Sequence, residues 1–328
     1  MAFNQGLSKS GSGSESGSGG GGKTGMGIDL GNAHALLIGV GTYEYGKWSI
    51  PVAARDAEAL AEVLGTPEHC NYPREQIHRL THAEATRENI LAALDHLAEV
   101  SRTPGESTIL VYFSGHGWVH EGRYYLLPHE TAPLDVASTA LPAERFKEAL
   151  RAIDAQRLLV MLDTCHAEGM AESKDSSAVT VIPAGYEPRA LDPQEAEALI
   201  ENDRGRVVLL SCQGDQKSWI EPGRDLSIFT EHLIAALRGE GARDGERFVT
   251  VSDLMGYVSR EVKRSAARIQ REQTPFYDIK ASDFVVARVP DLPATPEASA
   301  QPGNTVVHNT AGRDMYQGVG TITVNNRD

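Results

Sequence analysis

The sequence predicts an α/β fold in which helices cover both faces of a mostly parallel β-sheet. From residue 34 onward, short apolar runs typical of strands alternate with longer amphipathic stretches typical of helices. The runs at 108–113 and 157–162 are almost continuously apolar, as expected for parallel strands buried on both faces. With 328 residues, of which 41% are hydrophobic, the chain can bury a large core.

The alternation assigns the elements in chain order. Strands are expected at 34–41, 77–80, 108–113, 124–127, 157–162, 207–211 and 283–288. Helices are expected at 52–64, 86–100, 142–153, 228–237 and 251–268. Thr86 is the expected N-cap of the second helix, and Pro142 starts the third, where its missing N–H costs nothing.

Four segments fall outside this alternation. Residues 1–27 are mostly glycine and serine, so we expect a disordered leader ahead of a domain at 28–288. Within that domain, residues 168–205 are long and polar, which we interpret as an activation or processing loop. Residues 289–304 form a linker rich in proline and alanine, and 305–328 a strand-like tail too short to fold alone.

The leader contains a phosphate-loop pattern, GxxxxGK[ST], at residues 17–24. A true phosphate loop follows a strand and opens a helix, whereas this one lies in a glycine and serine tract before the apolar run at 35–40. Nucleotide binding is therefore an alternative that the context disfavours.

Charge and cysteine content restrict the function classes. A net charge of −14 argues against nucleic acid or an anionic membrane as the main partner. The three cysteines, Cys70, Cys165 and Cys212, show no CxxC spacing and suit free thiols in a reducing compartment. The sequence has no apolar run long enough for a membrane span and no signal-peptide core, so we expect a cytoplasmic protein.

Two strand ends carry reactive side chains. His116 follows the strand at 108–113 and Cys165 follows the strand at 157–162. Because functional groups gather beyond the carboxyl ends of parallel strands, the imidazole and the thiol are expected to face each other. The thiolate is the nucleophile, and His116 would take its proton and later return it to the leaving amine. The alternative is a structural cysteine and a hydrogen-bonded turn histidine, but the paired placement favours catalysis.

The residues around this pair have expected roles too. The backbone N–H groups of Gly117 and Cys165 are the expected oxyanion donors, and Gly117 allows close approach of substrate. His166 is a poor base, because adjacent side chains on an extended segment point apart. The remaining histidines lack ligand spacing, so we assign no metal site. Cys70 and Cys212 are expected to be inert. The alternative for Cys212, which ends a strand, is that it lines the cleft.

The motifs SGHG at 114–117 and DTCHAEG at 163–169 resemble those of caspase-like cysteine peptidases, in particular the prokaryotic caspase and metacaspase branch. A histidine about 50 residues before the cysteine agrees with this resemblance. It covers residues 34–288 and includes RDA at 55–57 and QTP at 273–275. The resemblance implies a three-layer α/β/α sandwich with about six mostly parallel strands, and peptide-bond hydrolysis by a His/Cys dyad.

The resemblance also implies the pocket for the residue before the cleaved bond, called S1. In the metacaspase branch its walls are two acids and a small residue, at positions that correspond here to Asp56, Ser114 and Asp163. Strand alternation agrees, since it puts Asp163 and Cys165 on one side. Two carboxylates attract a guanidinium or ammonium group, so we predict cleavage after Arg or Lys rather than Asp. The alternatives are helix N-terminal stabilisation by Asp56 and a loop-closing hydrogen bond by Asp163.

Regulation is expected in the long polar loop, because family members are often zymogens cut there. The candidate cleavage points are Lys174, Arg189, Arg204 and Arg206. Some metacaspases need calcium, but Glu168, Glu172 and Asp175 show no clear ligand spacing, so we expect no cofactor and leave calcium as an alternative. Trp219 is either a wall of a further substrate subsite or a core residue.

The sequence thus predicts a cysteine endopeptidase that cleaves protein or peptide substrates after Arg or Lys and is regulated by processing or by a partner protein. Similarity to bacterial relatives that act in stress, cell-death and antiphage systems suggests a defence role. The alternative is a non-catalytic interaction module with the same fold, its tail recruiting partners. The intact His116 and Cys165 pair argues against this module.

Overall fold

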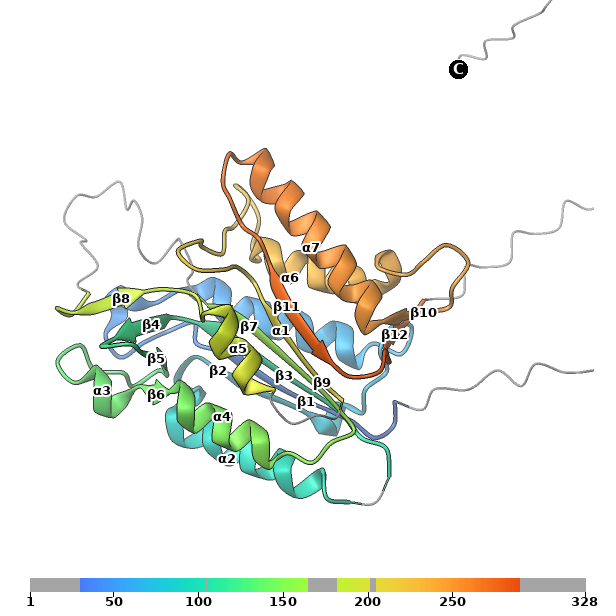
Figure 1. The fold of residues 1–328 in the computed structure, drawn as a ribbon, viewed down its shortest axis with the longest axis horizontal. Helices are drawn as coiled ribbons and strands as arrows, with labels where there is room; N and C mark the ends of the chain where they lie inside the picture. Colours follow the sequence, from blue (N-terminus) through green and yellow to red (C-terminus); the bar gives the residue numbers. More distant parts are fainter. Residues whose placement is uncertain (1–29, 104, 165–181, 201–204, 290–328) are drawn as a thin grey trace, which may run out of the picture. The chain divides into compact units, whose positions relative to one another are not determined.

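The centre of the protein is a six-stranded sheet with the strand order β11-β9-β7-β3-β1-β2 (Figure 1). The structure is a computed structural model that describes residues 30–103, 105–164, 182–200 and 205–289. The parallel strands are β1 (Ala33–Gly39), β2 (Ile77–Thr81), β3 (Thr108–Gly115), β7 (Arg157–Thr164) and β9 (Arg206–Leu210). At one edge, β11 (Phe276–Lys280) runs antiparallel to β9. The predicted mostly parallel, six-stranded sheet is confirmed.

Helices cover both faces of this sheet, which makes the domain a three-layer sandwich (Figure 1). One face carries α1 (Pro51–Gly65), α6 (Ile228–Ala235) and α7 (Val251–Arg268). The other carries α2 (Arg87–Val100), α4 (Ala143–Ala152) and α5 (Pro193–Leu199). As predicted, Thr86 caps α2, since its side chain accepts a hydrogen bond from the Asn89 N–H. Pro142 is the N-cap of α4 rather than its first residue.

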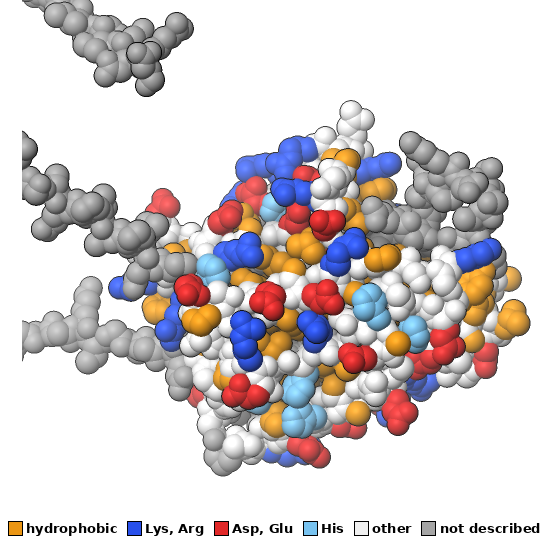
Figure 2. All heavy atoms as spheres, turned by 180° about the vertical axis from the view of Figure 1, so that it is seen from behind, with side chains coloured by type: hydrophobic (Ala, Val, Ile, Leu, Met, Phe, Trp, Pro, Cys, Tyr) orange, Lys and Arg blue, Asp and Glu red, His pale blue; other side chains and the backbone are white. Residues whose placement is uncertain are grey.

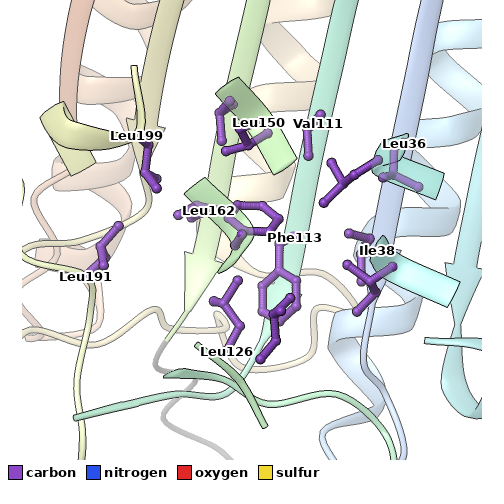
Figure 3. Close-up of a cluster of buried hydrophobic side chains, with 14 of the residues drawn as sticks. Leu36, Ile38, Val111, Phe113, Leu126, Leu150, Leu162, Leu191 and Leu199 are labelled. Atoms are coloured by element: carbon purple, nitrogen blue, oxygen red, sulfur yellow. The ribbon is translucent and has the colours of Figure 1, made fainter. Parts of the chain in front are cut away.

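Each face of the sheet has its own hydrophobic core, because strand side chains alternate between the faces. In β3, Val111 and Phe113 enter the core under α2, α4 and α5, which Figure 3 shows with Leu150 and Leu162. Tyr112, by contrast, enters the core under α1, α6 and α7. The same alternation carries Ser114 in β3 and Asp163 in β7 to the face of α1 and α6.

A second, antiparallel sheet follows directly from the end of β3. Its order is β6-β5-β4-β8, and its strands are β4 (Gly117–His120), β5 (Arg123–Leu126), β6 (Leu141–Pro142) and β8 (Tyr186–Pro188). The short helix α3 (Val136–Thr139) lies between β5 and β6 in the sequence. Because β4 begins at Gly117, this sheet fixes the backbone immediately after His116.

The smaller elements complete the described chain. They are the turns η1 (Gly46–Trp48), η2 (Arg74–Gln76) and η3 (His82–Glu84), the π-helical turn η4 (Ala236–Glu240) after α6, and the strand pair β10 (Phe248–Thr250) and β12 (Val285–Arg288). The strand expected at 283–288 is thus β12, which pairs with β10, while β11 closes the main sheet. No strand was predicted at β11, because this edge strand is only partly buried and has no continuous apolar run.

Part of the long polar segment at 168–205 lies within the described residues and has regular structure. Its described part, 182–200, contains β8 and α5, where the Asp192 side chain caps α5 by accepting from the Gln194 N–H. Both elements are too short to show a periodic pattern, so the segment has the sequence character of a loop. The predicted processing loop therefore has ordered structure on its C-terminal side.

One face of the protein carries mixed charge. Figure 2 shows acidic and basic side chains interspersed over one face, without a large field of a single sign. Among the described residues, no helix has the length and apolar character needed to cross a bilayer.

Candidate active site

The two motif-bearing strands are neighbours in the main sheet, and their ends are in register. Gly115, the last residue of β3, pairs with Thr164, the last residue of β7. His116 follows Gly115 directly. Cys165 and His166 lie outside the described residues, one and two residues beyond Thr164. The structure therefore places His116 beside the strand end that leads into the predicted nucleophile.

The His116 side chain is held by a backbone carbonyl. It is 1% exposed, and its Nε2 lies 2.8 Å from the carbonyl oxygen of Trp48. A carbonyl only accepts hydrogen bonds, so this contact assigns the proton of the neutral imidazole to Nε2. Nδ1 is then the basic nitrogen.

The peptide group after His116 has a fixed direction. The His116 carbonyl oxygen accepts a hydrogen bond of 3.0 Å from the Leu127 N–H, just beyond β5. In a trans peptide the C=O and the next N–H point in opposite directions, so the Gly117 N–H points away from β5. The Gly117 carbonyl oxygen in turn accepts from the Arg189 N–H at 3.0 Å.

Gly117 is required by a close approach of Tyr124. A Cβ atom at position 117 would lie 1.8 Å from Tyr124 Oη and 2.6 Å from its Cζ. The Tyr124 hydroxyl donates a hydrogen bond of 3.0 Å to Thr164 Oγ1. Tyr124 thus connects β5 to the end of β7 across a glycine that leaves room for its ring.

The three predicted S1 residues come from different elements and share one face of the sheet. Asp56 lies in α1, Ser114 in β3 and Asp163 in β7, and all three are fully buried. The two acids are bridged by Ser227, whose N–H donates to Asp56 Oδ1 at 3.0 Å and whose hydroxyl donates to Asp163 Oδ2 at 2.8 Å. The structure therefore brings together two carboxylates that are far apart in the sequence.

Ser227 is a residue that the sequence analysis missed. It is the N-cap of α6, because its Oγ also accepts a hydrogen bond of 3.1 Å from the Thr230 N–H. Serine directly before an apolar helix was a recognisable capping signal. Its bridge between Asp56 and Asp163 had no sequence signal.

The two acids give this region a negative field. Burial raises the pKa of Tyr112 well above its ordinary value, and the nearby carboxylates of Asp56 and Asp163 raise it further. Tyr112 belongs to the same polar group, since its hydroxyl lies 2.8 Å from Thr230 Oγ1. Asp56, Asp163 and Tyr112 therefore lie in one buried, electrostatically coupled group on the face of α1 and α6.

The two described thiols are not activated. Burial raises the pKa of Cys212 to about 12, and its Sγ–H donates to the Gln216 carbonyl oxygen at 3.4 Å. Burial also raises the pKa of Cys70 far above its ordinary value. Both thiols stay protonated at neutral pH, so neither can supply a thiolate.

Trp219 lies between core and surface. The half-buried side chain packs against the core under α1, α6 and α7 and lines an open hollow of about 500 Å³. The Arg271 guanidinium lies 4.4 Å from the centroid of its ring, and the indole N–H donates to the Glu272 carbonyl oxygen. The structure thus shows an exposed edge at this residue as well as a core contact.

The described processing candidates differ in accessibility. Arg206 is 4% exposed, and its guanidinium donates to the carbonyl oxygens of Leu150 and Ile153 at the end of α4. A protease cannot reach it in the folded protein, so this candidate is corrected to a structural residue. The Arg189 backbone is bonded to Gly117, as above, and its side chain lies 3.8 Å from Asp215. Lys174 and Arg204 lie outside the described residues.

No metal site is visible in the part of the chain that the structure describes, where no group of three His, Cys, Asp or Glu side chains is placed to hold an ion. The calcium alternative concerned Glu168, Glu172 and Asp175, which lie outside that part.

Comparison with known proteins gives one family. A model of the caspase domain matches residues 32–284. No curated protein matches the chain. Similar solved structures include the Drosophila initiator caspase Dronc, which is 12% identical in sequence. The match covers 76% of this chain and 80% of Dronc, with a TM-score of 0.49.

Two further structures show comparable similarity. Caspase-1 from Spodoptera frugiperda has 15% identity over 77% of this chain and 90% of that chain, with a TM-score of 0.48. A protein from Geobacter sulfurreducens has 17% identity over 76% of this chain and 94% of that chain, with a TM-score of 0.47. Because these TM-scores are below 0.5, the family assignment rests on the domain match.

Proposed function

The chain belongs to the caspase domain family, and from this premise we propose that it is a cysteine endopeptidase that hydrolyses peptide bonds after arginine or lysine. The observation that carries the proposal is the pairing of Gly115 with Thr164 at the ends of β3 and β7. Neighbouring strands lie about 4.8 Å apart and successive Cα atoms about 3.8 Å. This spacing supports the proposal that His116 and Cys165, each one residue beyond this pair in the sequence, act together as a dyad.

The proposed reaction uses His116 as the proton carrier. Nδ1 takes the Sγ proton of Cys165, and the thiolate attacks the carbonyl carbon of the substrate. The imidazolium then gives its proton to the departing amine, leaving a thioester on Cys165. Water, deprotonated by Nδ1, cleaves the thioester and restores the thiol. Throughout, the Trp48 carbonyl oxygen stabilises the charged ring through Nε2–H.

The developing oxyanion requires nearby N–H donors, and we assign Gly117 and Cys165 to this role. The direction of the Gly117 N–H, away from β5, supports the assignment, because β5 does not compete for it. A side chain at position 117 would displace Tyr124 and with it the end of β7.

The preference for a basic residue follows from the paired acids. An arginine side chain reaching Asp163, with Asp56 on the other side of Ser227, would meet two negative charges. An aspartate side chain would be repelled by both. Ser114 completes the wall as the small residue of β3.

Regulation and cellular role complete the proposal. Lys174 and Arg204 are the proposed cleavage points, because Arg206 is buried and the Arg189 backbone is bonded to Gly117. Composition and family resemblance support a cytoplasmic protein with a stress or defence role. We assign Trp219 to a further subsite, since it lines an open hollow.

Fluorogenic peptides that end in Arg, Lys or Asp test this function directly. The wild-type protein is expected to release the fluorophore from the Arg and Lys peptides at least about 100-fold faster than from the Asp peptide, because about 3 kcal/mol separates a paired from a repelled charge in such a site. Faster release from the Asp peptide would contradict the S1 assignment. No release from any of them, before or after limited trypsin treatment, would favour the non-catalytic interaction module.

A further inference from the structure

The loop between β1 and α1 holds His116 at several points. Its hydrogen bonds close it on itself: Trp48 N–H donates to Tyr45 O at 2.9 Å, Ser49 N–H to Gly46 O at 3.1 Å, and Tyr43 N–H to Ser49 Oγ at 3.2 Å. Tyr43 and Trp48 are almost fully buried against His116. The segment 43–49 is therefore a compact turn next to the predicted base.

Two of its residues contact His116 through different groups. The Trp48 carbonyl oxygen binds Nε2 of the ring at 2.8 Å, whereas the Tyr43 hydroxyl accepts a hydrogen bond of 3.0 Å from the His116 backbone N–H. The Tyr43 ring also lies against the imidazole, with 5.2 Å between centroids and 32° between planes. Tyr43 is thus the side chain that holds both the backbone and the ring of His116.

His116 is the single residue between Gly115, the last residue of β3, and Gly117, the first residue of β4. The strand pairing holds the chain on either side of it, and the hydrogen bonds of its own peptide groups hold the residue itself. Its carbonyl oxygen is fixed by the Leu127 N–H and its N–H by the Tyr43 hydroxyl. Burial raises the pKa of Tyr43 above its ordinary value, so the phenol remains neutral at physiological pH.

We propose that Tyr43 is a positioning residue that sets the orientation of His116 toward the thiol through the bond from its hydroxyl to the His116 N–H. The proposal rests on the proposed function, since it concerns the base of the His116 and Cys165 pair. Misplacement of a reacting group by about 1 Å costs about 10²-fold in rate. Loss of the Tyr43 hydroxyl should therefore slow proton transfer while substrate binding is kept.

The test compares Tyr43→Phe with Tyr45→Phe in the full chain. Tyr45 is a matched control, because it lies in the same turn and packs edge-to-face on Trp48 at 5.1 Å. Among the described residues its hydroxyl makes no hydrogen bond. Tyr43→Phe is expected to lower kcat for an Arg peptide about 10- to 100-fold with KM within about 2-fold, and to move the acid limb of the pH profile to higher pH. Tyr45→Phe is expected to match wild type.

Equal kcat values and pH profiles in the two variants would overturn the proposal. A fall in kcat of Tyr43→Phe that is explained by a lowered melting temperature would overturn it too. If wild-type protein cleaves no peptide, the proposed function fails, and the positioning role is still judged by the pH dependence of Cys165 alkylation with iodoacetamide. A midpoint of alkylation that moves to higher pH in Tyr43→Phe but not in Tyr45→Phe supports the positioning role. Identical alkylation curves for the two variants contradict it.

Discussion

Replacing Cys165 by alanine is expected to reduce hydrolysis of an Arg-terminated peptide by about 10³-fold or more, because no other thiol can take its place. Cys212, close to the end of β7, has a pKa raised to about 12 by burial, and Cys70 lies in the core. The measurement is the rate of fluorophore release by purified variants whose melting curves match that of wild type.

Cys212→Ala is the control for this experiment. The Cys212 thiol is buried, and its Sγ–H donates to the carbonyl oxygens of Gln216 and Thr164. Because this thiol is not ionised, the Cys212→Ala variant is expected to keep more than about half of the wild-type activity. If Cys212→Ala loses activity and Cys165→Ala keeps it, Cys212 is the nucleophile and the assignment to Cys165 is wrong.

The second large effect is expected from Asp163→Asn. Asparagine keeps the shape of the side chain, and its Oδ1 can still accept the Ser227 hydroxyl, so the change removes mainly the negative charge. Removing one partner of a buried charge pair costs about 2–5 kcal/mol. We therefore expect kcat/KM for an Arg peptide to fall about 10²-fold.

A citrulline peptide distinguishes lost charge from lost structure. Citrulline is the neutral isostere of arginine, so its slow cleavage is expected to be the same in wild type and Asp163→Asn. Asp95→Asn, an exposed carboxylate on α2, is the matched control and should leave both rates unchanged. A proportional loss with both peptides would show that Asp163 stabilises the fold rather than the cationic side chain.

The strongly periodic elements could be predicted from the sequence. The helix expected at 251–268 is α7 with the same bounds, and the apolar runs at 108–113 and 157–162 are β3 and β7, buried along nearly their whole lengths. These elements have patterns set by their own burial, so each one is visible in its own residues. Their alternation was sufficient to predict the layered sheet.

The short elements could not be predicted, because their existence depends on partners. β4 pairs with β5 and β8, β8 pairs with β4, and β11 pairs with β9. None has a run of apolar residues long enough to identify a strand from sequence, and α5 has fewer than two full turns of clear periodicity.

The candidate site shows the same division. His116 was predicted because a reactive side chain follows the end of a strand, and Asp56 and Asp163 were predicted because they match motif positions of the family that the sequence resembles. The Trp48 carbonyl oxygen had no sequence signal, since every residue carries one. The Tyr43 hydroxyl was equally invisible, because its contact with the His116 N–H exists only once the loop has folded over the end of β3.

The ionisation of Cys165 is the most direct test of a thiol activated by His116. We expect iodoacetamide to alkylate Cys165 in wild type with a midpoint below about pH 7.5, and in His116→Ala with a midpoint near the ordinary value of about 8.5. Mass spectrometry of the peptides identifies the labelled cysteine, and Cys70 and Cys212 should remain unlabelled in the folded protein. Superimposable alkylation curves for the two proteins would contradict the account.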